Sequence, residues 1–111
     1  MILMIGEFEY LILTAAARLG EQAYGATIRE SVQQATRRSC SIGALYTTLD
    51  RLEKKGLIKT WMGDPTPQRG GRSKRLVGVT TKGVEAASAF YEAIRRVSRG
   101  VSWEANRMSI R

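Results

Sequence analysis

Apolar residues recur at helical spacing in the middle of the chain, between residues 41 and 56. Leu45, Leu49 and Leu52 follow one another at steps of four and three, with Ile42 beside them, which predicts a helix with one apolar face. The opposite face has small residues near its start and cations near its end: Gly43, Ala44, Thr47, Arg51 and Lys54. Small side chains let a helix approach a bulky partner closely, and the major groove of DNA admits one helix. We therefore refer to this segment as the reading helix.

The residues around the reading helix predict its two ends and the elements that come after it. Ser41 is a suitable N-cap and Gly56 a suitable residue just past the C-terminus. Residues 57–62 (LIKTWM) predict a strand, 63–71 (GDPTPQRGG) a loop with both prolines of the chain, and 72–80 a second strand. The second strand starts with the cations Arg72, Lys74 and Arg75. Helix, strand, loop and strand is the element order of a winged helix-turn-helix.

The first predicted helix, residues 6–19, is apolar over a wide arc. Its apolar positions at helical spacing are Phe8, Leu11, Ile12, Ala15 and Leu19. One small domain seldom covers such an arc, so a dimer contact is one interpretation and a central core helix is the other. Residues 26–36 predict a second helix, which would cross the DNA backbone in a helix-turn-helix.

The last predicted helix begins at the N-cap Thr80 and carries a seam at alternating steps of three and four: Val84, Ala87, Tyr91, Ile94, Ser98 and Val101. Pairing with a second copy and packing on its own domain are both possible interpretations of this seam. Gly100 is a candidate for a kink or an end, and Trp103 falls in a weakly periodic tail. The expected fold is mainly α (α+β), with a winged helix-turn-helix domain over residues 1–80 and a dimerisation helix with its tail over residues 81–111.

Three runs of this sequence resemble motifs of PadR-type transcriptional regulators. LYTTLDRLEKKGLI is similar to that family's LYP-L-RLE-GLI signature, GGRSKRLVGVTTKG to its GGR-RK-Y-LT-G wing, and YGATIRE to its YGYEL-like run. Ile42 and Thr47 stand where prolines are usual, and Val77 and Gly78 where tyrosine is common. The resemblance spans about residues 8–90. It implies the small subfamily with one helix after the wing, in which the last helix packs against the partner's first helix.

The charge distribution supports a polyanionic partner. The formal net charge is +8 and the isoelectric point about 10.3. Residues 1–38 carry four basic and four acidic side chains, residues 39–80 eight and three, and residues 81–111 six and three. The excess therefore lies mainly on the reading helix and the wing.

These observations predict a dimeric repressor that binds a pseudo-palindromic double-stranded operator and is released by a small molecule or a stress signal. The alternative is a winged-helix module whose basic wing binds an acidic protein. The expected DNA-binding residues are Ser41, Gly43, Ala44, Tyr46, Thr47, Thr48, Arg51, Arg69, Arg72 and Lys74. The expected dimer contacts are Phe8, Leu11, Ile12, Ala15, Tyr91, Ile94 and Val101. The resemblance also implies a pocket for a small aromatic ligand, for which Phe8, Tyr91 and Trp103 are the candidates.

Nothing in the sequence supports catalysis. It has no histidine and a single cysteine, Cys40, so an ordinary Ser-His or Cys-His pair and a metal site are both unexpected. No enzyme activity, cofactor or metal is therefore expected. Residues 1–5 are apolar but too short for a signal peptide, and no run is long enough to span a membrane, so the cytoplasm is the expected compartment.

Overall fold

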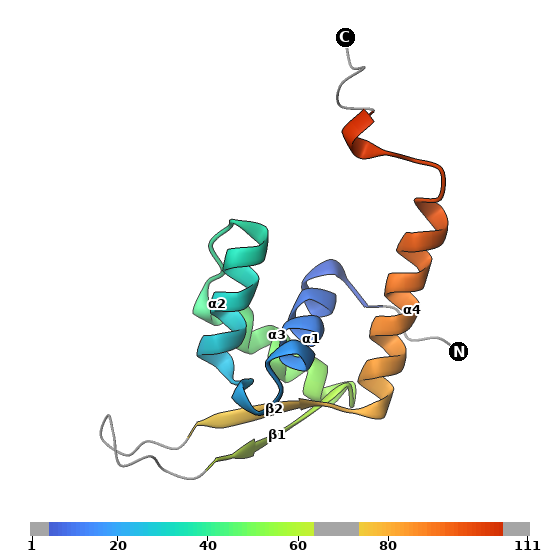
Figure 1. Cartoon of the computed structure of the whole chain (residues 1–111). Helices are drawn as coiled ribbons and strands as arrows, with labels where there is room; N and C mark the ends of the chain where they lie inside the picture. Colours follow the sequence, from blue (N-terminus) through green and yellow to red (C-terminus); the bar gives the residue numbers. More distant parts are fainter. Residues whose placement is uncertain (1–4, 64–73, 106–111) are drawn as a thin grey trace.

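The computed structural model describes residues 5–63 and 74–105, and its elements have the order of a winged helix (Figure 1). They are α1 (Glu7–Leu19), the 3-10 turn η1 (Gly20–Gln22), α2 (Gly25–Thr36), α3 (Ile42–Lys54), β1 (Ile58–Met62), β2 (Arg75–Val79) and α4 (Thr81–Val97). The predicted fold class, mainly helical with a two-stranded antiparallel wing, is confirmed. No helix in the described part of the chain is long and apolar enough to cross a membrane.

Both predicted N-caps are confirmed by hydrogen bonds. The Ser41 hydroxyl accepts from the Ala44 N–H at 3.0 Å, and the Thr80 hydroxyl accepts from the Gly83 N–H at 3.0 Å. Gly56 ends the reading helix α3 with a φ of +77°, a conformation that glycine adopts without a steric penalty. The Thr80 hydroxyl also donates to the Gly56 carbonyl at 2.7 Å. The start of α4 is thereby attached to the end of α3.

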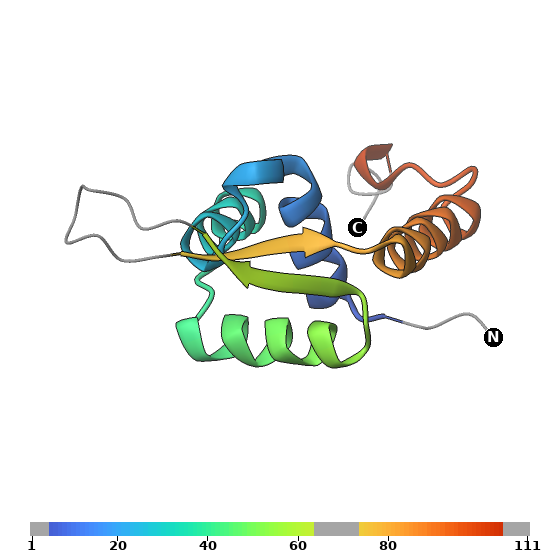
Figure 2. The same ribbon diagram turned by 90° about the horizontal axis from the view of Figure 1, so that it is seen from below.

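The two strands are antiparallel; β1 begins one residue later than predicted, β2 ends at Val79, one residue before the predicted end, and the predicted start of the second strand at residues 72–73 lies outside the described residues. Ile58 pairs with Val79 at the inner end of the hairpin, and Met62 pairs with Arg75 at its loop end. Figure 2 shows α3 running along one side of this hairpin, with the loop end of the two strands pointing away from α4. The hairpin therefore extends from the domain next to the reading helix.

The connection between α1 and α2 adds one more backbone contact to the sheet, which was not predicted. The Val77 N–H donates to the Ala23 carbonyl at 2.9 Å, and Tyr24 forms an isolated antiparallel bridge with Leu76. Because β2 is bonded on both edges, its inner part is fixed to the start of α2 as well as to β1.

The core lies around α1, which contacts α2, α3, β2 and α4. The most deeply buried large side chains come from several different segments of the chain: Ile12, Leu13, Ile28, Leu45, Leu49, Leu52 and Leu57. Burying side chains of this size contributes roughly 1.5–3 kcal/mol each relative to exposure. The three leucines that defined the apolar face of α3 are all among them.

Two of the predicted dimer contacts on α1 are corrected by this arrangement. Ile12 is 0% exposed and Ala15 is 6% exposed, so both belong to the core of their own domain. Phe8 and Leu11 are partly buried and pack against the same core. The wide apolar arc of α1 is covered because neighbouring elements surround this helix, which is the second of the two interpretations.

α4 starts on the domain and then leaves it. Ala86 is buried, and the ring of Phe90 stacks on Tyr10 of α1 with ring centroids 4.8 Å apart. The C-terminal part of α4 extends beyond the other elements (Figure 1). The helix ends at Val97, earlier than the predicted seam, and Gly100 comes after it with a φ of +81°.

A largely buried ion pair joins α1 to the end of α3. Lys55 Nζ lies 2.8 Å from Glu9 Oε2, while Glu9 Oε1 accepts from the Gly6 N–H at 3.0 Å. Burial acts to raise the pKa of Glu9, but the Lys55 hydrogen bond, the Gly6 N–H and the charges of Lys55 and Arg51 outweigh it. The pKa of Glu9 therefore lies below its ordinary value.

Candidate nucleic-acid interface

The outer face of α3 is open. Gly43, Ala44, Thr47 and Arg51 are all exposed, as expected for a reading face. A Cβ built on Gly43 would meet no other atom within 4 Å, so no part of the described chain covers the start of this face. The helix presents small side chains here and one cation further along, a surface that can approach a bulky anionic partner.

Two residues of α3 lie elsewhere than their sequence pattern predicts. Thr48 is 5% exposed and its hydroxyl donates to the Ala44 carbonyl at 2.8 Å, so its expected role as a DNA contact is wrong. Ile42 is 58% exposed and does not complete the apolar face. Its apolar side chain stands at the N-terminal end of the reading face.

Tyr46 connects α3 to the start of α2. Its side chain is 41% exposed, and its hydroxyl occupies the space that a side chain at position 25 would need. A Cβ on Gly25 would collide with the Tyr46 hydroxyl and lie 2.8 Å from Cζ. Glycine at the first position of α2 therefore lets the two helices of the helix-turn-helix approach each other at the reading face.

The turn between α2 and α3 is fixed by side chains of α2. Arg29 Nε donates to the Cys40 carbonyl, and the Cys40 N–H donates to Gln33 Oε1 at 2.8 Å. Cys40 itself is buried, with its thiol against the Ser41 carbonyl. These bonds set the position of the Ser41 N-cap, and with it the direction in which α3 starts.

Of the cations expected on the wing, Lys74 is described, whereas Arg69 and Arg72 lie outside the described residues. Lys74 is exposed, and its ammonium lies 3.1 Å from the Tyr24 hydroxyl and 4.3 Å from the centroid of the Tyr24 ring. A cation over an aromatic face is attracted by the ring quadrupole. The residue before β2 is therefore a cation held beside the start of α2.

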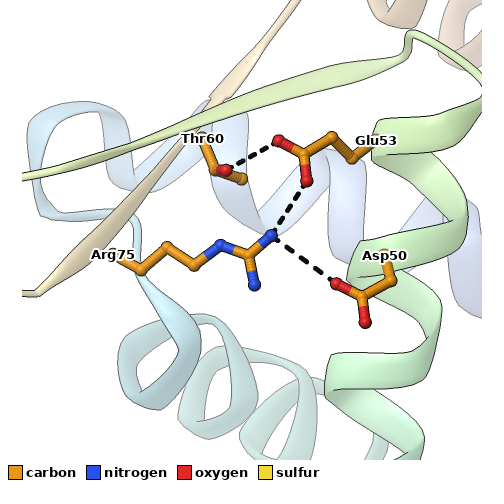
Figure 3. Close-up of polar contacts among 4 residues, drawn as sticks. All are labelled: Asp50, Glu53, Thr60 and Arg75. Carbon is orange, nitrogen blue, oxygen red and sulfur yellow. Dashed lines mark hydrogen bonds and ion pairs between the residues drawn. The ribbon is translucent and has the colours of Figure 1, made fainter.

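The next residue, Arg75, makes the most extensive polar contact of the described part of the hairpin, and it was not among the predicted site residues. Arg75 Nη2 lies 2.9 Å from Glu53 Oε1 and 3.5 Å from Asp50 Oδ1, and Thr60 donates to Glu53 Oε2 at 2.7 Å (Figure 3). The hydrogen bond from Thr60, together with the charge and hydrogen bond of Arg75, lowers the pKa of Glu53 against the opposing effect of desolvation. Arg75 and Thr60 come from different strands, so both strands are bonded to α3.

The residues expected to form a ligand pocket differ in burial within the monomer. Phe8 packs against the domain core, whereas Tyr91 is 51% and Trp103 75% exposed. The dimer candidates Ile94 and Val101 are also exposed, at 47% and 44%. Within the described residues, no group of three or more acidic, cysteine or histidine side chains could hold a metal ion.

An open, small-residue reading helix beside a two-stranded hairpin defines a winged helix-turn-helix protein. Residues 12–89 match the Transcriptional regulator PadR-like family, and the chain therefore belongs to this family of transcription factors, which are not enzymes. The resemblance noted in the sequence is confirmed. No curated protein sequence is significantly similar to the chain.

Solved structures of such regulators share the fold. A PadR-like transcriptional regulator from Bacillus cereus is 23% identical, with a TM-score of 0.71 over 94% of this chain and 93% of that one. A PadR family transcription regulator from Clostridium difficile is 27% identical, with a TM-score of 0.63 over 85% of this chain and 93% of that one. RosR from H. salinarum is 24% identical, with a TM-score of 0.65 over 94% and 86% of the two chains.

Proposed function

We propose that this PadR-like regulator is a dimeric repressor that binds a pseudo-palindromic DNA operator and leaves it when a small aromatic ligand binds. The observation that carries the proposal is the open outer face of α3, small at Gly43 and Ala44 and cationic at Arg51. Such a face fits a major groove lined by phosphates. The net charge of +8 supplies the attraction that binding to any duplex requires.

The side chains of this face have different roles in the proposed complex. Thr47, in the middle of the exposed face, reaches base edges, and Ile42 lies against a thymine methyl group. Tyr46 and Arg51 contact phosphates at the two sides of the groove, and the Ser41 N-cap lies at the end nearest the backbone. Lys74, with Arg69 and Arg72 of the wing sequence, binds phosphates of the adjacent minor groove.

Pairing through α4 would place two reading helices on one duplex. Large apolar side chains remain in solvent on this helix and beyond its end: Val84, Tyr91, Ile94, Val97 and Val101. Exposed apolar side chains in a continuous stripe mark an interaction surface. A second copy carries the same stripe, so two copies related by two-fold symmetry can bury the stripes against each other. The two copies of α3 would then lie about 34–36 Å apart, one helical turn of DNA.

A ligand releases the operator if it binds more tightly to a dimer whose reading helices are wrongly spaced for the operator than to the DNA-binding form of the dimer. Tyr91 and Trp103 are exposed in the monomer, and Phe8 is only partly buried. A partner copy packed on α4 would enclose these aromatic rings, so a flat aromatic molecule is the class of ligand we propose for the dimer interface.

The first test separates base reading from phosphate binding. The operator is selected from random duplexes with the purified protein, and the affinities for operator and scrambled duplex are measured over a salt titration. Thr47→Ala should cost about 1–3 kcal/mol at the operator and leave scrambled DNA unchanged. Lys74→Ala should weaken both duplexes and reduce the salt slope by about one. Equal weakening of both duplexes by Thr47→Ala would contradict the proposed division of roles.

The second test uses the empty space at Gly43. Gly43→Leu should fold normally, because nothing lies within 4 Å of the new Cβ, yet its side chain should keep α3 out of the groove. Gln22→Leu, an exposed change in η1 outside the proposed DNA and dimer contacts, is the control that should bind DNA normally. Wild-type protein that binds no duplex even at low salt would reject DNA binding and favour an acidic protein partner instead.

A further inference from the structure

Arg75 is a cation at the start of β2, at the loop end of the hairpin, and its side chain is directed at the reading helix. Its guanidinium contacts Glu53 and Asp50, which lie three residues apart in α3 and so about one turn from each other (Figure 3). Glu53 is contacted at the same time by Thr60 of β1. One carboxylate of the reading helix thus receives a hydrogen bond from each strand of the wing.

We propose that Arg75 is a positioning residue, which holds the wing at a fixed angle to α3 so that the reading helix and the wing meet one duplex together. This inference rests on the proposed DNA binding. It assigns Arg75 a role through Asp50 and Glu53, and it assigns no contact between Arg75 and DNA.

The position of these contacts along the hairpin explains why they matter. Ile58, at the inner end of β1, is buried in the domain, whereas Trp61 and Met62 towards the loop end are exposed. Apolar packing therefore fixes the inner end, and the bonds of Thr60 and Arg75 hold the hairpin further out. The Tyr24–Leu76 bridge holds the far edge of β2, so without the Thr60 and Arg75 bonds the hairpin would keep its contact with the start of α2 but lose its fixed angle to α3, while the core remained intact.

The other side of β2 is held as well. Lys74 and Arg75 are consecutive, so in an extended strand their side chains point to opposite faces. Lys74 reaches Tyr24 beside the start of α2, while Arg75 reaches Glu53 on α3. The start of β2 is thus bonded to both helices of the helix-turn-helix.

The charges in this cluster favour positioning over a direct phosphate contact. Arg75 faces two carboxylates, so the three groups together carry a formal charge of −1. Such a cluster does not attract a phosphate. A planar guanidinium can bridge two carboxylates in a defined geometry, which the single ammonium of a lysine cannot reproduce.

The first experiment measures DNA affinity, which should change in opposite directions if Arg75 positions the wing and if it contacts phosphate directly. Asp50→Asn combined with Glu53→Gln removes both carboxylates with little change of shape and makes the protein more positive by two charges. If Arg75 positions the wing, affinity for the selected operator should fall about tenfold, the size expected for coupled contacting residues, while affinity for scrambled DNA should stay the same or rise. If Arg75 contacts phosphate directly, freeing it from the carboxylates should tighten binding to both duplexes.

The matched control is Glu21→Gln combined with Glu85→Gln, which changes the charge equally at two exposed positions outside the cluster. Operator affinity should not fall in this control. A fall of the same size in the control would assign the effect to net charge and overturn the inference.

Two further variants test the geometry. Thr60→Val removes the hydroxyl that bonds Glu53, and Arg75→Lys keeps the cation but not its forked geometry, so neither alters the charge. Both should reduce the ratio of operator to scrambled affinity at an unchanged salt slope, and amide exchange of residues 58–62 should speed up in the absence of DNA. Wild-type ratio and exchange in both variants would overturn the positioning role. Failure of the wild type to bind any duplex would instead reject the proposed function itself.

Discussion

α1 and α4 carry similar apolar arcs, yet the fold covers them differently. α1 lies among α2, α3, β2 and α4, so nearly all of its apolar side chains are buried or partly buried within one copy. α4 touches the domain through Gly83, Ala86 and Phe90 and leaves Tyr91 and Ile94 in solvent. A wide apolar arc therefore has two meanings, a central place in a small core or a surface for a partner. Position in the fold, and not the arc itself, decides between them.

The largest expected effect concerns the exposed arc. Ile94→Asp should weaken the proposed dimer by several kcal/mol, because a symmetric interface would bury the unpaired charge twice. Sedimentation at micromolar concentration should show dimers for the wild type and folded monomers for the variant. A wild-type chain that sediments as a stable monomer would contradict the assignment of α4 to a partner.

The next largest effect is expected for the apolar arc of α1, which the rest of the domain covers. Ile12→Ala should destabilise the fold by about 2–5 kcal/mol, because it leaves a cavity in the centre of the core. Thermal melts should show this loss at every protein concentration, whereas the loss caused by Ile94→Ala should depend on concentration, as expected for a dimer contact. If Ile12→Ala left the melting curve unchanged, the central position of α1 would be wrong.

A smaller effect on stability is expected when an ion pair of α1 is compared with an ion pair of α4. Lys55→Ala leaves the carboxylate of Glu9 buried without its cation and should cost about 1–3 kcal/mol. Arg95→Ala breaks an exposed pair with Glu92 on α4, 3.6 Å long, and should change stability by less than about 0.5 kcal/mol. Urea unfolding of both variants, at one protein concentration, measures the difference.

The smallest effect is a dependence on pH. The pKa of Glu9 is lowered in the folded protein, so its contribution to stability is complete above the ordinary value of 4.5 and is lost as pH falls through the lowered pKa. Glu9→Gln should therefore flatten the acid side of the stability curve. Melting temperatures measured from neutral to acidic pH would reveal an unchanged acid side if the Glu9 assignment were wrong.

Much of the fold was predictable because apolar periodicity and helix N-caps are visible in the sequence and determine where the helices lie. Leu45, Leu49 and Leu52 identified the inner face of α3, and Ser41 and Thr80 identified two helix starts. The same pattern misplaced Ile42, since a position at the very end of a helix can extend past the elements that cover the rest. Thr48 was misplaced because a hydroxyl that bonds the preceding turn is buried as easily as a small apolar group.

The candidate site was predictable only in outline. In the sequence, a cation at the start of a strand, such as Arg75, is simply one more charge of the wing. Its partners Asp50 and Glu53 lie on another element, more than twenty residues away, and no local signal joins them. The bond between Lys74 and Tyr24 spans fifty positions and was missed for the same reason.

The close approach of Gly25 and Tyr46 also restricts how this sequence can change. An alanine at position 25 meets the tyrosine hydroxyl, so that exchange requires the Tyr46 side chain to move while Tyr46 is present. Once Tyr46 has been replaced by a residue without the ring, such as serine, the space is free and the alanine becomes acceptable. The order of two substitutions then determines whether the intermediate protein folds well. A chain that has lost Tyr46 and gained an alanine in place of Gly25 cannot readily regain the tyrosine.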